Sequence, residues 1–128
     1  GLSKRILIDS AGTHAYHVGD SPDPRSQQTA VKHGIDLSSQ RARQVKASDF
    51  EVYDYVVAMD RDNHAILSSQ CPDQHRHKLK LFLEFAPQIS ETEVPDPYYG
   101  GDSGFEHVYQ LIDAAADGLM ADIESRHL

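Results

Sequence analysis

The apolar run at residues 55–59 constrains the fold of this chain more than any other feature. The run is unbroken and rich in β-branched and aromatic side chains, which favour strands. A strand that is apolar at every position needs cover on both of its faces, an arrangement typical of parallel sheets between helices. Residues 55–59 therefore predict a fully buried strand of a parallel sheet.

Strand and helix patterns alternate on both sides of this run. Residues 6–8 form a short apolar segment that predicts another buried strand. Residues 78–83 alternate first and then become apolar, which predicts a strand near the sheet edge. Helical patterns separate the strands at residues 48–53 and 60–69, and Asp60 is suited to cap the second of these. The alternation predicts an α/β domain with a parallel sheet.

Two further helices have recognisable ends. Asp23 and Pro24 are suited to the N-cap and first position of a helix that ends near His33, where Gly34 supplies a left-handed residue. Ser103 begins the last helix in a capping box with a glutamate three residues later. Apolar residues of that last helix recur every three or four positions and predict its buried face: Phe105, Val108, Ile112, Ala115, Leu119 and Ile123.

The loop before the last helix places an acid beside two aromatic rings. Pro95 and Pro97 hold the backbone extended on either side of Asp96, and a carboxylate on a rigid loop suits a general acid. Tyr98 and Tyr99 would wall a cleft for a flat substrate. The alternative is a plain Pro/Gly turn ahead of a helix.

This loop resembles the Asp-Pro-Tyr-Tyr-Gly loop of the low-molecular-weight protein tyrosine phosphatases. Other short motifs of that family follow in the family's order along the chain, at residues 8–13, 18–25, 33–35, 42–44, 49–50, 53–56, 58–60 and 63. The resemblance implies a four-stranded parallel sheet with helices on both faces. It also implies hydrolysis of a phosphotyrosine protein or a small aryl phosphate through a phosphocysteine intermediate, with no metal and no cofactor.

One departure from the family concerns the nucleophile. The family's Cys-x5-Arg phosphate loop, which follows its first strand, has no counterpart here. The only cysteine is Cys71, with His77 six residues later and no glycine-rich nest around it, so we interpret it as a non-catalytic thiol. We therefore expect residues 1–128 to form one domain that is N-terminally incomplete and inactive alone. The missing strand belongs inside the sheet, so we also expect a complementing N-terminal segment to fill the gap.

The resemblance assigns roles to individual residues. Asp96 is the general acid and later the base, and Tyr98 and Tyr99 shape the substrate cleft. Tyr16 and His17 lie in the family's variable loop, which faces the substrate ring, although an exposed loop pair is an equally simple reading.

Two more positions match residues that support the phosphate loop. Ser10 matches a serine whose hydroxyl orients that loop, although a serine at a strand end also caps turns. Gln40 stands where many members have a histidine that braces the loop, and glutamine donates and accepts hydrogen bonds without carrying charge. His33 we interpret as a helix C-terminal histidine that favours the helix dipole.

Composition excludes several classes of function. The net charge of −8 argues against a nucleic-acid or anionic-membrane partner, both of which need clustered Lys and Arg. A single cysteine fits a reducing cytoplasm, and no apolar run is long enough for a transmembrane helix. Two alternatives stay open: a pseudophosphatase or binding module, and an arsenate reductase, which relays oxidation through extra cysteines.

Overall fold

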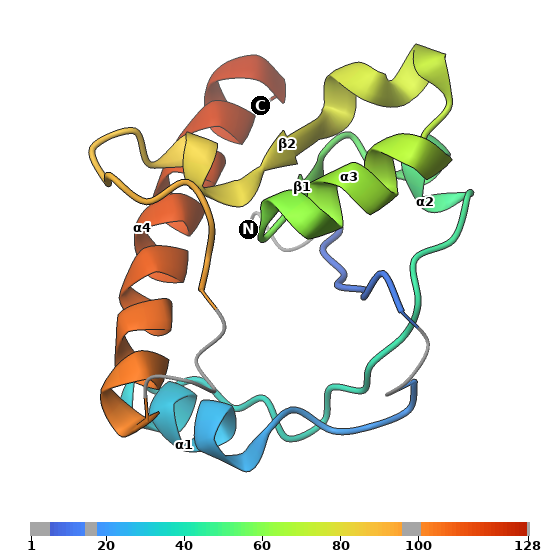
Figure 1. Ribbon diagram of the computed structural model, residues 1–128. Coiled ribbons are helices and arrows are strands. Elements are labelled where there is room, and N and C mark those ends of the chain that lie inside the picture. The colour runs from blue at the N-terminus through green and yellow to red at the C-terminus, as the bar shows by residue number, and fades with distance from the viewer. Residues whose placement is uncertain (1–5, 15–17, 96–100, 128) are drawn as a thin grey trace.

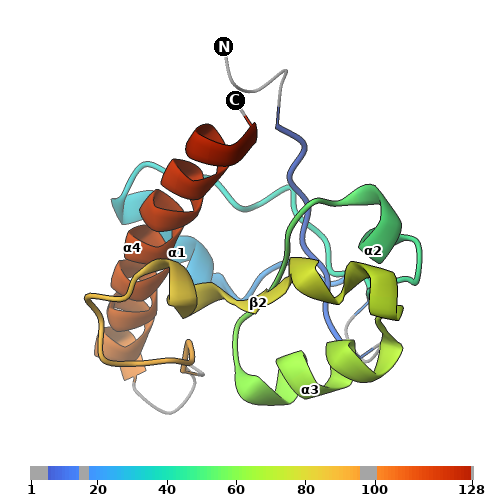
Figure 2. The ribbon, with the colours of Figure 1, turned by 90° about the horizontal axis from the view of Figure 1, so that it is seen from above.

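The computed structural model describes residues 6–14, 18–95 and 101–127. The elements follow one another as α1 (Pro24–Lys32), α2 (Asp49–Val52), β1 (Val56–Ala58), α3 (Arg61–Gln70), the 3₁₀ helix η2 (Asp73–Lys78), β2 (Leu79–Leu81), the 3₁₀ helix η3 (Phe82–Phe85) and α4 (Gly101–His127). The two strands lie between α4 and α1 on one side and α2 and α3 on the other (Figures 1 and 2). Among the described residues, no helix is both long and apolar enough to cross a membrane.

The two strands form a parallel pair in which Val56 lies opposite Leu79 and Ala58 opposite Leu81. The strand predicted at residues 55–59 is therefore confirmed in its centre, although only Ala58 is buried and the two valines before it are half-buried. The strand predicted at residues 78–83 is confirmed only for its middle. Its end tightens into η3, which places Phe82 and Leu83 together in the core against α4.

The strand predicted at residues 6–8 is wrong for the described structure. The segment belongs to no strand, and the side chains of Leu7 and Ile8 are 71% and 80% exposed. An extended segment needs a neighbouring backbone for its N–H and C=O groups, and the first pairing along this stretch is the isolated parallel bridge of Gly12 with Gln44. The described sheet accordingly contains two strands, and the four-stranded sheet is not confirmed.

Local capping signals predicted both ends of α1 and the start of α3 correctly. The Asp23 carboxylate accepts a hydrogen bond from the Arg25 N–H at 2.7 Å, and Gly34 has a φ of +80° after the C-cap of α1. The Asp60 carboxylate accepts from the Asn63 N–H at 2.7 Å and caps α3. These caps satisfy N–H groups that have no partner inside the helix.

Helix α4 packs on η3 through a core of Phe82, Leu83, Ala86, Leu111 and Ala115. The predicted buried face is confirmed at Phe105 and Ala115 but wrong at Ile112, which is 38% exposed while Leu111 is buried. Contact with η3 selects Leu111 because that side chain faces the Phe82 cluster. Helix α4 already includes Gly101, so it begins ahead of the predicted start at Ser103.

Polar contacts join the ends of α4 to the rest of the fold. Near its start, the Glu106 carboxylate lies 2.8 Å from Nε2 of His33, whose ring stacks on Tyr109 at 3.8 Å between centroids. His33 is the C-cap of α1, as predicted, and it therefore also holds α1 against α4. Near the end of α4, the Tyr55 hydroxyl donates to the Asp122 carboxylate at 2.6 Å.

Candidate functional site

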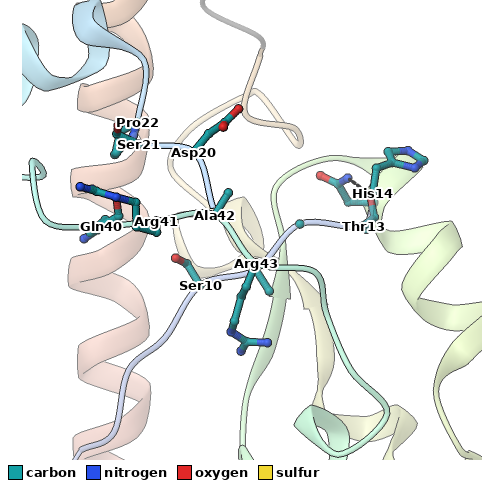
Figure 3. Close-up of a pocket in the computed structure, with 13 residues that line it drawn as sticks. Ser10, Thr13, His14, Asp20, Ser21, Pro22, Gln40, Arg41, Ala42 and Arg43 are labelled. Atoms are coloured by element: carbon teal, nitrogen blue, oxygen red, sulfur yellow. Dashed lines mark hydrogen bonds between the residues drawn. The ribbon is translucent and has the colours of Figure 1, made fainter. Parts of the chain in front are cut away.

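An open pocket of about 470 Å³ lies where three loops meet (Figure 3). Its wall is formed by residues 10–14, 20–22 and 40–43, with Asn63 of α3. Thr13 and His14 lie on one side, Gln40 and Arg41 on the other, and Ser10 between them. The pocket is therefore built by segments that are distant in sequence.

Backbone hydrogen bonds hold these loops together. The Gly12 N–H donates to the Arg43 carbonyl at 2.8 Å, and the Val45 N–H donates to the Gly12 carbonyl at 2.9 Å. The Gly19 N–H donates to the Ala42 carbonyl, and the Ala42 N–H to the Asp20 carbonyl, each at 2.8 Å. These bonds fix the pocket wall through backbone groups.

Two arginines line the pocket, and they differ in how far they are paired. Arg43 contacts the Asp49 carboxylate at 2.9 Å and the Asp9 carboxylate at 3.1 Å. The hydrogen bond between Arg43 and Asp49 lowers the pKa of Asp49 and raises the pKa of Arg43, so both groups stay ionised near neutral pH. Arg41 is exposed and donates to the carbonyls of Ser38 and Gln40. Its remaining N–H groups give the pocket capacity to bind an anion.

Two of the predicted site residues meet in this pocket. Ser10 and Gln40 are separated by 30 positions in the sequence, and both line its wall. The Ser10 N–H donates to the Asp9 carboxylate at 2.8 Å, and the Gln40 N–H donates to the Leu37 carbonyl at 3.1 Å. The other predicted site residues lie outside the described residues: Asp96, Tyr98, Tyr99, Tyr16 and His17.

The chain that leads to Asp96 is anchored beside the same region. The Val94 N–H donates to the Met59 carbonyl at 2.8 Å, just after β1. The Glu93 carboxylate accepts from the Arg61 N–H at 2.8 Å, at the start of α3. These bonds place Val94 next to the carboxyl end of β1, the end at which parallel sheets carry their ligand sites.

A second hollow of about 230 Å³ runs along β1. One side is formed by residues 9–13 and the other by residues 55–59, with Asn63 and Leu67 of α3 nearby. β1 pairs with β2 along one edge, and in the part of the chain that the structure describes the lining of this hollow includes β1 but no residue of β2. We call this hollow the β1 groove.

Cys71 lies away from both hollows. It is the C-cap of α3, it is 5% exposed, and it packs with Phe50, Ala58 and Leu67. Its Sγ lies 3.4 Å from the Pro72 carbonyl oxygen. A buried thiol among apolar side chains is a poor nucleophile, because the reactive form is the thiolate. The position agrees with its interpretation as a non-catalytic thiol.

Sequence reasoning missed roles for three residues of the pocket wall: Thr13, Asn63 and Arg41. Thr13 and Asn63 lie within the family's motifs, which was the one indication in the sequence that they matter. Their contact joins positions 50 apart and has no local pattern. Arg41 lies outside those motifs.

Comparison with known proteins identifies the family. The sequence model of the family described as "Low molecular weight phosphotyrosine protein phosphatase" matches residues 1–127. A putative low molecular weight protein-tyrosine-phosphatase of Synechocystis is 44% identical over 124 residues, which are 96% of this chain and 78% of the relative. The corresponding protein of Schizosaccharomyces pombe is 45% identical over 122 residues, which are 93% of this chain and 77% of the relative.

Solved structures agree with the sequence comparison. A protein tyrosine phosphatase from Entamoeba histolytica superposes with a TM-score of 0.93 at 38% identity, over 99% of this chain and 81% of that one. YfkJ from Bacillus subtilis superposes with a TM-score of 0.91 at 34% identity, over 99% of this chain and 79% of that one. The chain belongs to the low molecular weight phosphotyrosine protein phosphatase family.

Proposed function

We propose that the protein hydrolyses phosphotyrosine in proteins, or small aryl phosphates, by covalent catalysis without a metal or cofactor. The observation that carries the proposal is the meeting of Ser10 and Gln40 in one pocket beside Arg41. Ser10 lies in a family motif that supports a phosphate loop, and Gln40 stands at a position where many members have a histidine that braces that loop. A cytoplasmic location fits this activity.

The nucleophile belongs, in this proposal, to a segment ahead of residue 1 that carries the Cys-x5-Arg loop. Three observations support this assignment: Cys71 is buried, Leu7 and Ile8 are exposed, and the β1 groove is lined, among the described residues, by β1 but by no residue of β2. A strand in the groove would pair with β1 and cover apolar side chains, and residues 6–8 would pair with its other edge to complete the four-stranded sheet of a single domain. The phosphate loop that follows it would then reach Ser10 and Gln40.

The chemistry has two steps. The thiolate sulfur attacks phosphorus while the bond from phosphorus to the aryl oxygen breaks, and Asp96 gives its proton to that leaving oxygen. Water then attacks phosphorus, Asp96 takes a proton from the water, and the sulfur–phosphorus bond breaks to release phosphate and the thiolate. Tyr98, Tyr99, Tyr16 and His17 flank the substrate ring.

Complementation tests the assignment of the nucleophile. Residues 1–128 are mixed with a synthetic peptide that contains a short apolar strand followed by a Cys-x5-Arg loop, and p-nitrophenyl phosphate hydrolysis is measured. We expect turnover with this peptide and none when its cysteine is replaced by serine. Turnover by residues 1–128 alone would contradict the assignment.

The acid role has its own test in the whole protein. Asp96→Asn should slow hydrolysis of phenyl phosphate by about 10²–10⁴-fold, because its leaving group needs a proton. Hydrolysis of p-nitrophenyl phosphate should fall much less, because its leaving group is already stable as an anion. Equal losses for both substrates would remove Asp96 from this role. A whole protein without any turnover would leave a pseudophosphatase that binds its partner.

A further inference from the structure

A hydrogen bond joins residues 9–13, one side of the β1 groove, to helix α3. The side-chain amide nitrogen of Asn63 donates to the Thr13 hydroxyl oxygen at 3.2 Å, and Figure 3 draws this bond beside Thr13. Both residues line the pocket and the groove. The bond therefore joins the segment that carries Ser10 to the first turn of α3.

Asn63 projects from a rigid support. Its backbone N–H donates to the capping carboxylate of Asp60 at 2.7 Å, and the N–H of Arg61 donates to Glu93 at 2.8 Å. The start of α3 is thus fixed by two carboxylates. A side chain on such a support holds its partner at a defined position.

Thr13 is less firmly held on its own side. Its neighbour Gly12 makes the bridge with Gln44, and the Gln44 side chain reaches the Thr13 carbonyl at 3.4 Å. Thr13 is only partly exposed, whereas Ser10 and the two residues after it are exposed. The contact with Asn63 therefore ties the end of an otherwise open segment to the body of the fold.

We propose that Thr13 and Asn63 are positioning residues of the phosphatase site, an inference that rests on the proposed function. Their bond sets the separation between the segment of Ser10 and the carboxyl end of β1, and hence the width of the space that receives the phosphate loop. In the part of the chain that the structure describes, the Thr13 hydroxyl proton and the Asn63 side-chain carbonyl make no hydrogen bond. Both residues line the pocket, and these two groups give them capacity for a further hydrogen bond.

The test compares variants of the whole protein by steady-state kinetics. Thr13→Val keeps the shape of the side chain and removes the acceptor, and Thr13→Ser restores it. Thr92→Val is a matched control, because Thr92 accepts a similar bond from Arg61 at 3.3 Å on a part of the chain that lines neither hollow. Asn63→Leu removes the donor of the same hydrogen bond, so it should change the kinetics as Thr13→Val does.

We expect Thr13→Val and Asn63→Leu to lower kcat by about tenfold, as the loss of one well-placed hydrogen bond does. KM and the inhibition constant for inorganic phosphate should change by less than about twofold, because the pair positions the loop and leaves its phosphate contacts intact. Thr13→Ser should recover most of kcat, and Thr92→Val should match the wild type.

Two results would overturn the inference and are distinguishable from failure of the proposed function. Unchanged kcat in Thr13→Val and Asn63→Leu would show that the pair positions nothing. An equal loss of kcat in Thr92→Val, or a loss that Thr13→Ser fails to restore, would show a general structural effect. A wild-type protein without turnover would instead overturn the proposed function, and the inference with it.

Discussion

The contact of α4 with η3 and the segment at residues 6–14 differ in how far their apolar side chains are buried. In the first, Phe82, Leu111 and Ala115 are buried in one cluster. In the second, Leu7 and Ile8 are exposed although they are equally apolar. The comparison shows that one region makes the contacts that stabilise the described fold. The other carries Ser10 and Thr13 of the pocket wall and leaves the apolar side chains of Leu7 and Ile8 exposed.

The space around one glycine in each region shows the same difference in packing. A Cβ added at Gly118 of α4 would lie 1.7 Å from the Phe85 carbonyl oxygen, so α4 and η3 pack as closely as glycine permits. A Cβ added at Gly12 would lie 3.7 Å from the His14 carbonyl oxygen, which is ordinary contact. The packed region therefore has no room for even one methyl group, whereas the open segment does.

Gly118→Ala should have the largest effect on stability. The added methyl group forces backbone away from backbone, so we expect a loss beyond the roughly 3 kcal/mol of ordinary overpacking. Gly12→Ala is the matched control and should change the free energy of unfolding by less than about 1 kcal/mol. Urea denaturation measures both. A similar change in the free energy of unfolding for the two variants would show that the two regions are packed equally tightly.

Truncation of apolar side chains should give the next largest difference. Leu111→Ala should cost about 3 kcal/mol, because it removes buried methyl groups and leaves a cavity. Ile8→Ala should cost less than about 0.5 kcal/mol in residues 1–128, because that side chain is exposed. A cost for Ile8→Ala near that of Leu111→Ala would show that residues 6–8 are buried in solution.

Tyr55→Phe should have an intermediate effect, with a distinct pH dependence. Burial, with the hydrogen bond to Asp122, raises the pKa of Tyr55 from 10.0 to about 12. The interaction is therefore fully present below pH 10, and its stabilisation is lost as the pH rises towards 12. Tyr55→Phe should cost about 1–2 kcal/mol at pH 8 and should flatten the alkaline fall in stability. An unchanged alkaline slope would show that Tyr55 is not the group responsible.

Glu106→Gln should have the smallest effect, on the acid side. Hydrogen bonds from His33 and then Gln110 lower the pKa of Glu106 below 4.5. Stabilisation by the ionised Glu106 is present above pH 4.5 and is lost as the pH falls through the lowered pKa. The variant should be slightly less stable than the wild type at pH 6, and the two should converge in acid. Glu124→Gln, an exposed site on the same helix, is the control. A gap between variant and wild type that persists in acid would contradict this account.

The sequence predicted the features that depend on near neighbours. Asp23, Gly34 and Asp60 were assigned correctly because a helix cap is decided within a few residues. Residues 55–59 were recognised because a continuous apolar run carries its own signal.

Features that depend on distant partners were predicted less well. Residues 6–8 have the pattern of a strand, but a strand also needs a paired neighbour, and no local pattern supplies one. Leu111 rather than Ile112 is buried because η3 decides which side of α4 is covered. Ser10 was predicted from a family motif and Gln40 from a position where many members have a histidine, whereas the contact of Thr13 with Asn63 required the folded chain.

The location of the covalent phosphate shows which cysteine is the nucleophile. The whole protein is mixed with an aryl phosphate, quenched during turnover and digested, and the phosphorylated peptide is identified by mass spectrometry. The account predicts one phosphocysteine within a Cys-x5-Arg sequence ahead of residue 1 and an unmodified Cys71. Phosphate on Cys71, or turnover without any phosphocysteine, would contradict it.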